Sequence, residues 1–383
     1  MWHTAHILTF YMPKKILLLS LSAGSGHLRA AESIREEAQN SYPDAIVEHR
    51  DIIEFINKPL KLVYRDFYLF ITKNAPLVWG YLYKTSNSPS VRETLHATSH
   101  IQALLAIKLA RFIEASMPDE IICTHFVCAE VAASILKNKK IKTPISIIIT
   151  DYQIHHLWIV EGVDRYFVAT HEMKKDLIAT GINCEQIIVS GIPVSPNVIT
   201  TKRTQQLYAK FKLNQKQPVI LALSGGFGLQ DISNIIETLG VSKLPLQICA
   251  VAGSNEALKS KLENLKLPSH INLHIYNFVH AIHELYALAD VVISKAGGLT
   301  VTECIARGLP LVITEPLPGQ ETANANFLRT HKAALQIKKN NDILNKIHRI
   351  LTNAALRDEL AKNMRSVARP FAARAILEQI IKK

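Results

Sequence analysis

The chain has 383 residues, of which 48% are hydrophobic and 20% are charged. This composition excludes a globally disordered chain, and the length favours two folded domains over one. The formal net charge of +12 favours an anionic partner, such as a nucleotide, a nucleic acid or an acidic membrane surface. The cysteines number five and include no CxxC pair, which disfavours a disulfide framework or a zinc site and fits a reducing cytosol.

The apolar runs of the chain are short. The length of each run is far below the roughly 18 apolar residues that indicate a membrane-spanning helix; the runs lie at residues 16–19, 145–149 and 291–293. They suit buried parallel strands instead. The first twelve residues are too short in their apolar part and too poor in charge for a signal peptide.

The first half of the chain alternates strand and helix patterns. Residues 14–20, KKILLLS, predict a strand, and the apolar positions that follow from Leu28 to Ala38 have the spacing of a helix. Further strands are expected at residues 120–124, 146–150, 166–169 and 187–190.

The second half repeats this alternation after a polar connection with a short helix at residues 195–217. Strands are expected at VILALSGG, LQICAVAG, residues 271–275, VVIS and LVIT. Two such series predict an α/β protein with two doubly wound parallel sheets that face each other across a cleft. The expected units are residues 13–197, residues 205–368, and a last helix within residues 369–383 that crosses back to the first unit.

The loop SAGSGH follows the first strand and precedes the first helix, a place where phosphate-binding loops occur. It lacks the third glycine of a dinucleotide fingerprint and the GK[ST] of a Walker A loop. His27 ends this loop at the sheet edge where open α/β sheets carry their active sites, so it could act as a general base. The alternative is a loop histidine with a structural hydrogen bond.

Two glycine pairs of the second half also precede helices. In ALSGGFG, the amides of Gly225 and Gly226 could approach a diphosphate, although an ordinary tight turn explains the pair as well. The pair that ends at Gly298 precedes a helix expected at residues 299–307, and a helix N-terminus favours bound phosphate. Lys295, just before this pair, would add a cation for a departing anion.

Three polar side chains around this helix are candidates for sugar contacts. Glu303 could hold a sugar hydroxyl, but residues 300–303, TVTE, also fit a capping box in which Glu303 only closes the helix start. In PLPGQE, Gln320 and Glu321 follow a rigid Pro-Gly turn and suit bidentate contacts with sugar hydroxyls. A solvated loop is the alternative for this pair.

Asp151 ends the strand pattern ISIIIT and would face the same cleft edge as His27 in a parallel sheet. It is a second candidate base, or the group that orients His27, and a helix N-cap or turn aspartate is the alternative. The chain has no Asp-x-Asp, which metal-dependent sugar transferases of the single-Rossmann type usually carry, so no metal is expected.

Residues 58–84 combine five basic and seven aromatic residues with one acid. This mix is typical of a membrane-interface segment, because cations meet anionic lipid and rings lie at the headgroup level. It could also stack on single-stranded nucleic acid, and a core helix pair with snorkelling lysines is the third alternative. The membrane candidates are Lys61, Tyr64, Arg65, Phe67, Trp79 and Tyr81.

Together these motifs resemble the two-domain glycosyltransferases of family 28, and most closely the diacylglycerol glycosyltransferases and monogalactosyldiacylglycerol synthases. The likeness runs almost end to end. It rests on GSGHLRAAESI at residues 24–34, the motif TDYQIHHLWIVEGVDRYFVAT at residues 150–170, GIPVSP at residues 191–196, and residues 294–321 continued by NANF. The resemblance implies a GT-B fold of two Rossmann-like domains, with a UDP-sugar in the C-terminal domain and an acceptor lipid at the N-terminal domain.

The resemblance also implies roles by position. Glu303 would bind the ribose hydroxyls, Val279 would contact the uracil through its backbone, and His27 would be the base or its partner. The hexose contacts would be Gln320 and Glu321, and the diphosphate contacts would be Gly225, Gly226, Gly298 and Thr300.

Two positions depart from the family pattern. Ser195 stands where relatives usually have an arginine that contacts the diphosphate, so phosphate binding must rely on other groups. Ser22 stands where plant-type members have an aspartate, which favours His27 or Asp151 as the base.

The expected function is inverting transfer of a hexose from a UDP-sugar to diacylglycerol, which forms a membrane glycolipid. The alternatives are UDP-GlcNAc-type transfer to another lipid-linked acceptor, and a non-catalytic membrane-associated UDP-sugar sensor. The expected partners are a UDP-hexose, diacylglycerol or a related lipid, and an anionic membrane surface, without nucleic acid or a cofactor. The protein would be cytoplasmic and would bind peripherally to the inner face of the cell membrane. Glucose, galactose and GlcNAc all remain open as the sugar.

Overall fold

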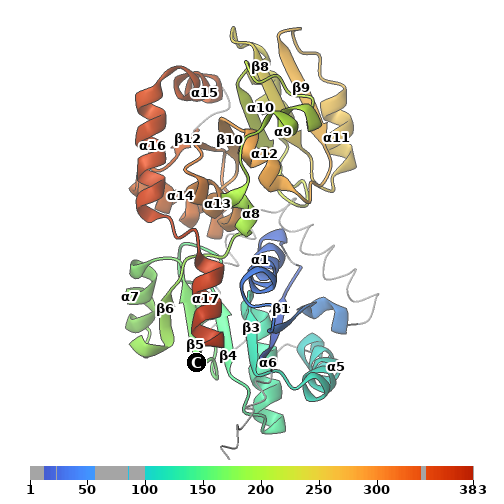
Figure 1. Cartoon of the computed structure of the whole chain (residues 1–383), viewed down its shortest axis with the longest axis vertical. Coiled ribbons are helices and arrows are strands. Elements are labelled where there is room, and N and C mark those ends of the chain that lie inside the picture. The colour runs from blue at the N-terminus through green and yellow to red at the C-terminus, as the bar shows by residue number, and fades with distance from the viewer. Residues whose placement is uncertain (1–12, 23, 57–84, 86–99, 338–341, 383) are drawn as a thin grey trace, which may run out of the picture.

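The computed structural model describes residues 13–22, 24–56, 85, 100–337 and 342–382. It contains two six-stranded sheets, one in each half of the chain, with helices packed around both (Figure 1). The strands pair in parallel throughout the described residues. The prediction of an α/β protein with two doubly wound parallel sheets is therefore confirmed.

The first sheet has the strand order β2-β1-β3-β4-β5-β6. Its strands are β1 (Lys15–Ser20), β2 (Ile46–Asp51), β3 (Glu120–Cys123), β4 (Ile145–Ile148), β5 (Arg165–Val168) and β6 (Ile187–Val189). The described residues of this half form the α-helices α1 (Ser25–Ser41), α5 (His100–Ser116), α6 (Phe126–Lys139) and α7 (His171–Ala179), and the 3-10 helices η1 (Ile52–Phe55), η2 (His156–Trp158) and η3 (Cys184–Gln186).

The sequence pattern explains the central strands of this sheet better than its edge. In β1 the apolar residues are all buried because helices cover both faces of a parallel sheet. The edge strand β2 was not predicted, since Glu48 and Arg50 interrupt its apolar residues and Ile46 is 51% exposed. The pairing of β2 with β1 is a contact between residues far apart in the sequence, which a local sequence pattern does not predict.

The second sheet has the order β12-β11-β10-β7-β8-β9. Its strands are β7 (Val219–Leu223), β8 (Leu246–Val251), β9 (Ile271–Tyr276), β10 (Val291–Ser294), β11 (Leu311–Ile313) and β12 (Leu335–Gln336). The helices of this half are α8 (Pro196–Thr200), α9 (Gln205–Lys210), α10 (Ser233–Gly240), α11 (Glu256–Glu263), α12 (Ile282–Leu288), α13 (Gly298–Arg307), α14 (Gln320–Thr330), α15 (Asp342–Thr352) and α16 (Ala354–Val367).

The last helix, α17 (Ala372–Ile381), lies against the first sheet, so it packs on the half that holds β1 (Figure 1). The buried apolar residues Ala373, Ile376 and Ile380 of α17 share a core cluster with Ile16 and Ile34. Within the described residues, the chain therefore crosses between the two halves twice, before α8 and again before α17.

Two arginines fix the connection between the halves. Arg203 donates to the carbonyl groups that end α12, and Arg307 at the end of α13 donates to the carbonyls of Val198 and Thr201. The expected single short helix of this connection is in fact two, α8 and α9.

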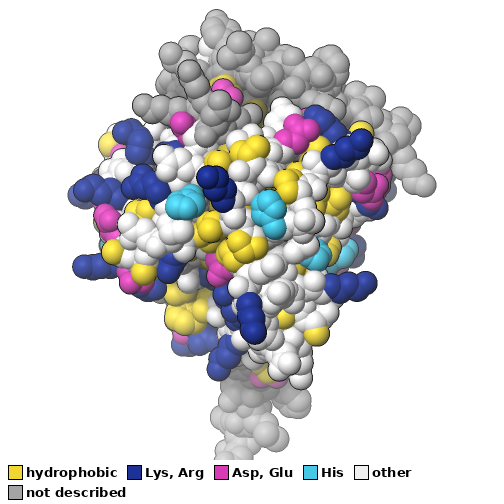
Figure 2. All heavy atoms as spheres, turned by 90° about the horizontal axis from the view of Figure 1, so that it is seen from above, with side chains coloured by type: hydrophobic (Ala, Val, Ile, Leu, Met, Phe, Trp, Pro, Cys, Tyr) yellow, Lys and Arg dark blue, Asp and Glu magenta, His cyan; other side chains and the backbone are white. Residues whose placement is uncertain are grey.

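The structure bears on the expected absence of a membrane-spanning helix and on the distribution of charge, but not on the expected membrane segment. In the part of the chain that the structure describes, no helix is long and apolar enough to cross a membrane. The basic aromatic segment at residues 58–84 lies outside the described residues, so its membrane candidates stay a prediction. Lysine and arginine side chains are spread around the face shown in Figure 2, with acidic side chains among them.

Candidate active site

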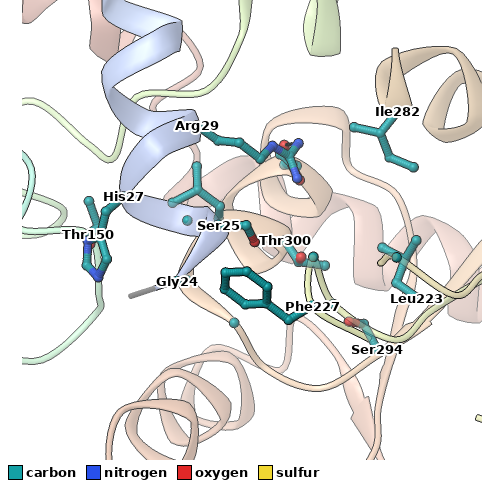
Figure 3. A pocket seen from close by; sticks show the side chains of 18 of the residues that line it. Gly24, Ser25, His27, Arg29, Thr150, Leu223, Phe227, Ile282, Ser294 and Thr300 are labelled. Atoms are coloured by element: carbon teal, nitrogen blue, oxygen red, sulfur yellow. Dashed lines mark hydrogen bonds and ion pairs between the residues drawn. The ribbon is translucent and has the colours of Figure 1, made fainter. Parts of the chain in front are cut away.

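A cavity of about 540 Å³ opens between the two halves, and residues of both line it (Figure 3). It gathers the residues that the sequence analysis singled out for catalysis and donor binding. They are His27, Asp151, Gly225, Gly226, Val279, Lys295, Gly298, Thr300, Glu303, Gln320 and Glu321. The parallel sheets explain this gathering, because the loops at the carboxyl ends of both sheets converge on one crevice.

His27 lies in the first turn of α1, partly exposed to the cavity. Its Nδ1 is 2.8 Å from the carbonyl oxygen of Thr124 and 3.0 Å from Oγ1 of Thr150. A carbonyl oxygen only accepts hydrogen bonds, so Nδ1 carries the hydrogen and Nε2 keeps its lone pair. Among the described residues Nε2 has no hydrogen-bond partner. Nδ1 therefore makes the structural hydrogen bond, and Nε2 is the nitrogen that is free to act as a base.

The surroundings of His27 favour its neutral form. The rings of His125 and Trp158 have their centroids 4.7 Å and 6.2 Å from the His27 ring. Burial lowers the pKa of His27 to about 4, although the hydrogen bond to Thr124 works against this effect. The imidazole is therefore neutral at pH 7 and can take a proton.

Asp151 is 8% exposed and lies beyond the end of β4. Its Oδ1 accepts a hydrogen bond of 3.0 Å from the amide of Asn324, and burial raises its pKa to about 6. The hydrogen on Nδ1 of His27 goes to Thr124, so the suggestion that Asp151 orients His27 is wrong. Asp151 remains a candidate base on the same cavity.

The N-terminus of α13 meets the first half of the chain at unusually short range. A Cβ atom on Gly298 would lie 2.1 Å from the carbonyl oxygen of Thr150, so no larger residue fits without moving the backbone. A Cβ on Gly226 would likewise lie 2.4 Å from Oγ of Ser25. These glycines serve close approach, which brings the positive end of a helix dipole next to His27.

The PLPGQE segment is held in place by a salt bridge. Nζ of Lys295 lies 2.8 Å from Oε1 of Glu321, and each side chain is 14% exposed. The other carboxylate oxygen of Glu321 accepts a hydrogen bond from the backbone N–H of Leu317 at 2.9 Å. The solvated-loop alternative is therefore wrong for Glu321, which begins α14 beside Gln320 at the cavity wall.

Glu303 is 1% exposed and is not a helix cap. The capping residue of α13 is Gly297, with no side-chain hydrogen bond, so the capping-box alternative is wrong. Oε2 of Glu303 accepts a hydrogen bond of 2.8 Å from the hydroxyl of Tyr286, and Oε1 pairs with the guanidinium of Arg29. Burial raises the pKa of Glu303, while Arg29 and Tyr286 lower it.

Several residues of this site were not predicted from the sequence. Asn324 is fully buried, accepts from the backbone N–H of Tyr152 and donates to Asp151 and to the Ala296 carbonyl. Asn324 and Arg29 lie inside the motifs NANF and GSGHLRAAESI, which offered a signal for both. Tyr286 offered none, because a tyrosine in an apolar helix is typical of a core.

Ser195, the position that departs from the family pattern, caps α8 with a 3.3 Å hydrogen bond from the backbone N–H of Asn197. Its hydroxyl also donates to Glu36 of α1.

The described residues hold no group of three or more histidine, cysteine, aspartate or glutamate side chains that could bind a metal ion.

Comparison with known proteins supports the resemblance. Residues 27–194 match the family described as monogalactosyldiacylglycerol (MGDG) synthase, and residues 220–380 match the glycosyltransferase family 28 C-terminal domain. A processive diacylglycerol beta-glucosyltransferase of Bacillus pumilus is 30% identical, over 97% of this chain and 95% of its own length. A Bacillus subtilis protein of the same description is 27% identical over 97% of this chain and 95% of its own length.

Two solved structures share the fold. MurG of Acinetobacter baumannii has a TM-score of 0.59 and 18% identity, with 97% of this chain and 100% of that chain covered. The UDP-GlcNAc 2-epimerase of Neisseria meningitidis, bound to UDP-GlcNAc, has a TM-score of 0.62 and 15% identity, with coverage of 96% and 100%. The predicted GT-B architecture of two Rossmann-like domains is confirmed. Because identity of 30% extends over nearly the whole chain and both halves match the expected families, the chain belongs to the family 28 diacylglycerol glycosyltransferases and is a glycosyltransferase.

Proposed function

We propose that this enzyme transfers a hexose from a UDP-sugar to the free hydroxyl of diacylglycerol. The observation that carries the proposal is the position of Thr150 between the two halves of the site. Its hydroxyl lies 3.0 Å from Nδ1 of His27, and its carbonyl lies against Gly298 at the start of α13. The neutral imidazole that we propose as the base and the helix N-terminus that we propose for the diphosphate therefore line one cavity.

The donor would occupy the second half of the cavity. Its diphosphate would meet the N-terminus of α13 and the amides of Gly225 and Gly226, and its uracil would lie at the backbone of Val279. The ribose would reach Glu303, and the hexose would reach Gln320 and Glu321 at the start of α14. Cavity walls from both halves would exclude water and so protect the donor from hydrolysis.

The chemical step is a single displacement. The hydroxyl oxygen of diacylglycerol forms a bond to the anomeric carbon while the bond from that carbon to the UDP oxygen breaks. The hydroxyl proton moves to Nε2 of His27, and the bonding electron pair leaves with UDP. The helix N-terminus at Gly298 and the Nζ of Lys295 stabilise the negative charge that develops on the leaving group.

The negative charge of the donor also changes the pKa of the proposed base, His27. An anionic diphosphate near His27 favours the imidazolium form, so donor binding raises the pKa of His27 from its low value in the free enzyme. A base that strengthens when the donor is bound is suited to act only in the loaded site.

One displacement at the anomeric carbon inverts its configuration. The relatives are described as beta-glucosyltransferases. A β product from an α-linked nucleotide sugar requires inversion, which agrees with one base and no covalent sugar intermediate. UDP-glucose is therefore the first donor to test. The acceptor is a membrane lipid, so the enzyme would work peripherally at an anionic membrane surface, which the net charge of +12 favours.

The test is UDP release by purified protein on liposomes that contain anionic lipid, with and without diacylglycerol. UDP-glucose, UDP-galactose and UDP-GlcNAc are supplied in parallel, and the lipid product is extracted and identified. Release that requires diacylglycerol, strongest with UDP-glucose, is the expected result. Release with no dependence on diacylglycerol would point to another lipid acceptor, and no release with any donor would contradict the proposal.

A further inference from the structure

Arg29 is a charged residue of the cavity for which the proposed reaction has no role. It lies on α1 two residues after His27, and the two side chains leave the helix in different directions, His27 toward Thr150 and Arg29 away from it (Figure 3). Its guanidinium crosses the cleft to the carboxylate of Glu303 on α13. The first half of the chain therefore supplies a partner to a side chain of the second half.

The carboxylate of Glu303 has acceptor capacity left over. An ionised carboxylate offers about four acceptor positions, two on each oxygen. The Tyr286 hydroxyl occupies one on Oε2, and Arg29 occupies one on Oε1. One position thus remains on each oxygen, and Glu303 lines the cavity. Two adjacent acceptors match the two O–H donors of a vicinal diol, such as the 2′ and 3′ hydroxyls of a ribose.

We propose that Arg29 is a positioning residue that holds Glu303 ionised and aimed for the ribose diol of the donor nucleotide. The inference rests on the proposed function, since it takes a nucleoside diphosphate sugar as the donor. Arg29 acts through Glu303 rather than on the reacting atoms. Because the two residues belong to opposite sides of the cleft, the diol site is complete only when the two halves are together.

The charges around Glu303 make this role dependent on pH. Burial raises the pKa of Glu303, and the positive charge of Arg29 opposes that effect. Without Arg29 the carboxyl would take up a proton at higher pH and lose an acceptor position. Nucleotide affinity would then fall as the pH falls, and at a higher pH than in the wild type. The other titratable groups that face the pair are Glu36 on α1, His283 and Tyr286 on α12, and Cys304 on α13.

The experiment is calorimetric titration of the full-length protein with UDP and with 2′,3′-dideoxy-UDP, which lacks the diol. Arg29→Gln is compared with the wild type and with Arg29→Lys, which keeps the charge. The matched control is Arg374→Gln. Arg374, like Arg29, forms an ion pair with a carboxylate, but its partner is Glu37 and the pair lies outside the cavity. Thermal unfolding of each variant reports any loss of folding.

We expect Arg29→Gln to weaken UDP binding roughly 10- to 100-fold, as for loss of a hydrogen bond to a charged group, and to leave 2′,3′-dideoxy-UDP binding unchanged. Arg29→Lys should recover part of the affinity. Equal UDP affinity in Arg29→Gln and wild type, or equal losses for both nucleotides, would overturn the inference alone. No UDP binding by the wild type would overturn the proposed function together with the inference.

Discussion

The two sides of the cleft hold their ionisable groups in opposite ways. On the first side, His27 is kept neutral by burial beside His125 and Trp158, and its one N–H is directed to a backbone carbonyl. The carboxylates of the second side are paired with cations: Glu321 with Lys295 of the same side, and Glu303 with Arg29, which the first side supplies. The difference indicates a division of labour, in which the neutral imidazole of His27 takes a proton and the ion-paired carboxylates of the second side hold the nucleotide.

The sharpest way to break this comparison is to remove the base. His27→Ala should lower kcat by roughly 10²- to 10⁴-fold, because the acceptor hydroxyl then loses its proton without help. Initial rates of UDP release on diacylglycerol liposomes measure the effect. His348→Ala is the control, since His348 is exposed on α15, away from the cavity. A variant that retains kcat would show that His27 is not the base.

The second test adds one methyl group at the contact between the two sides of the cleft. A Cβ on Gly298 would meet the Thr150 carbonyl at 2.1 Å, whereas a Cβ on Gly297 would meet no atom within 4 Å. Gly298→Ala should therefore push the helix N-terminus away from His27 and lower kcat/KM by about 10²-fold, the usual effect of a displacement near 1 Å. Gly297→Ala adds the same methyl group to open space. Equal rates for the two variants would contradict the close contact.

The smallest expected effect lies in the pH profile, which distinguishes the two candidate bases. A general base must be unprotonated, so the rate is lost as the pH falls through its pKa. With the pKa of His27 at about 4, kcat/KM should stay nearly level from about pH 8 to about pH 5. Asp151, with a pKa of about 6, would instead give a loss of roughly tenfold by about pH 5.

The sequence predicted the sheets well because buried parallel strands are apolar throughout. The pattern failed at β2, where an exposed edge leaves charged residues in the strand, and at the short strand β12. Helix and strand ends differed by one to a few residues, as at α1, which begins at Ser25 and not at Leu28. These ends are fixed by caps and tertiary contacts that a local pattern does not contain.

Within the site, motifs predicted which residues line the cavity but not how they pair. The loop that carries His27 and the run that carries Glu303 were both singled out, yet their 274-residue separation hid the contact between Arg29 and Glu303. The same holds for Asn324, whose bonds to Asp151 and Tyr152 span the cleft. Such pairings arise only when the two sheets are brought together, so they became visible with the fold.

The division of labour is tested most directly by measuring UDP affinity for His27→Ala and Glu303→Ala in parallel with the wild type. If one side takes the proton and the other holds the nucleotide, His27→Ala binds UDP as tightly as the wild type. Glu303→Ala then binds it at least roughly tenfold more weakly, because two hydroxyl contacts to a charged group are lost. A loss of UDP affinity in His27→Ala equal to that in Glu303→Ala would contradict the account.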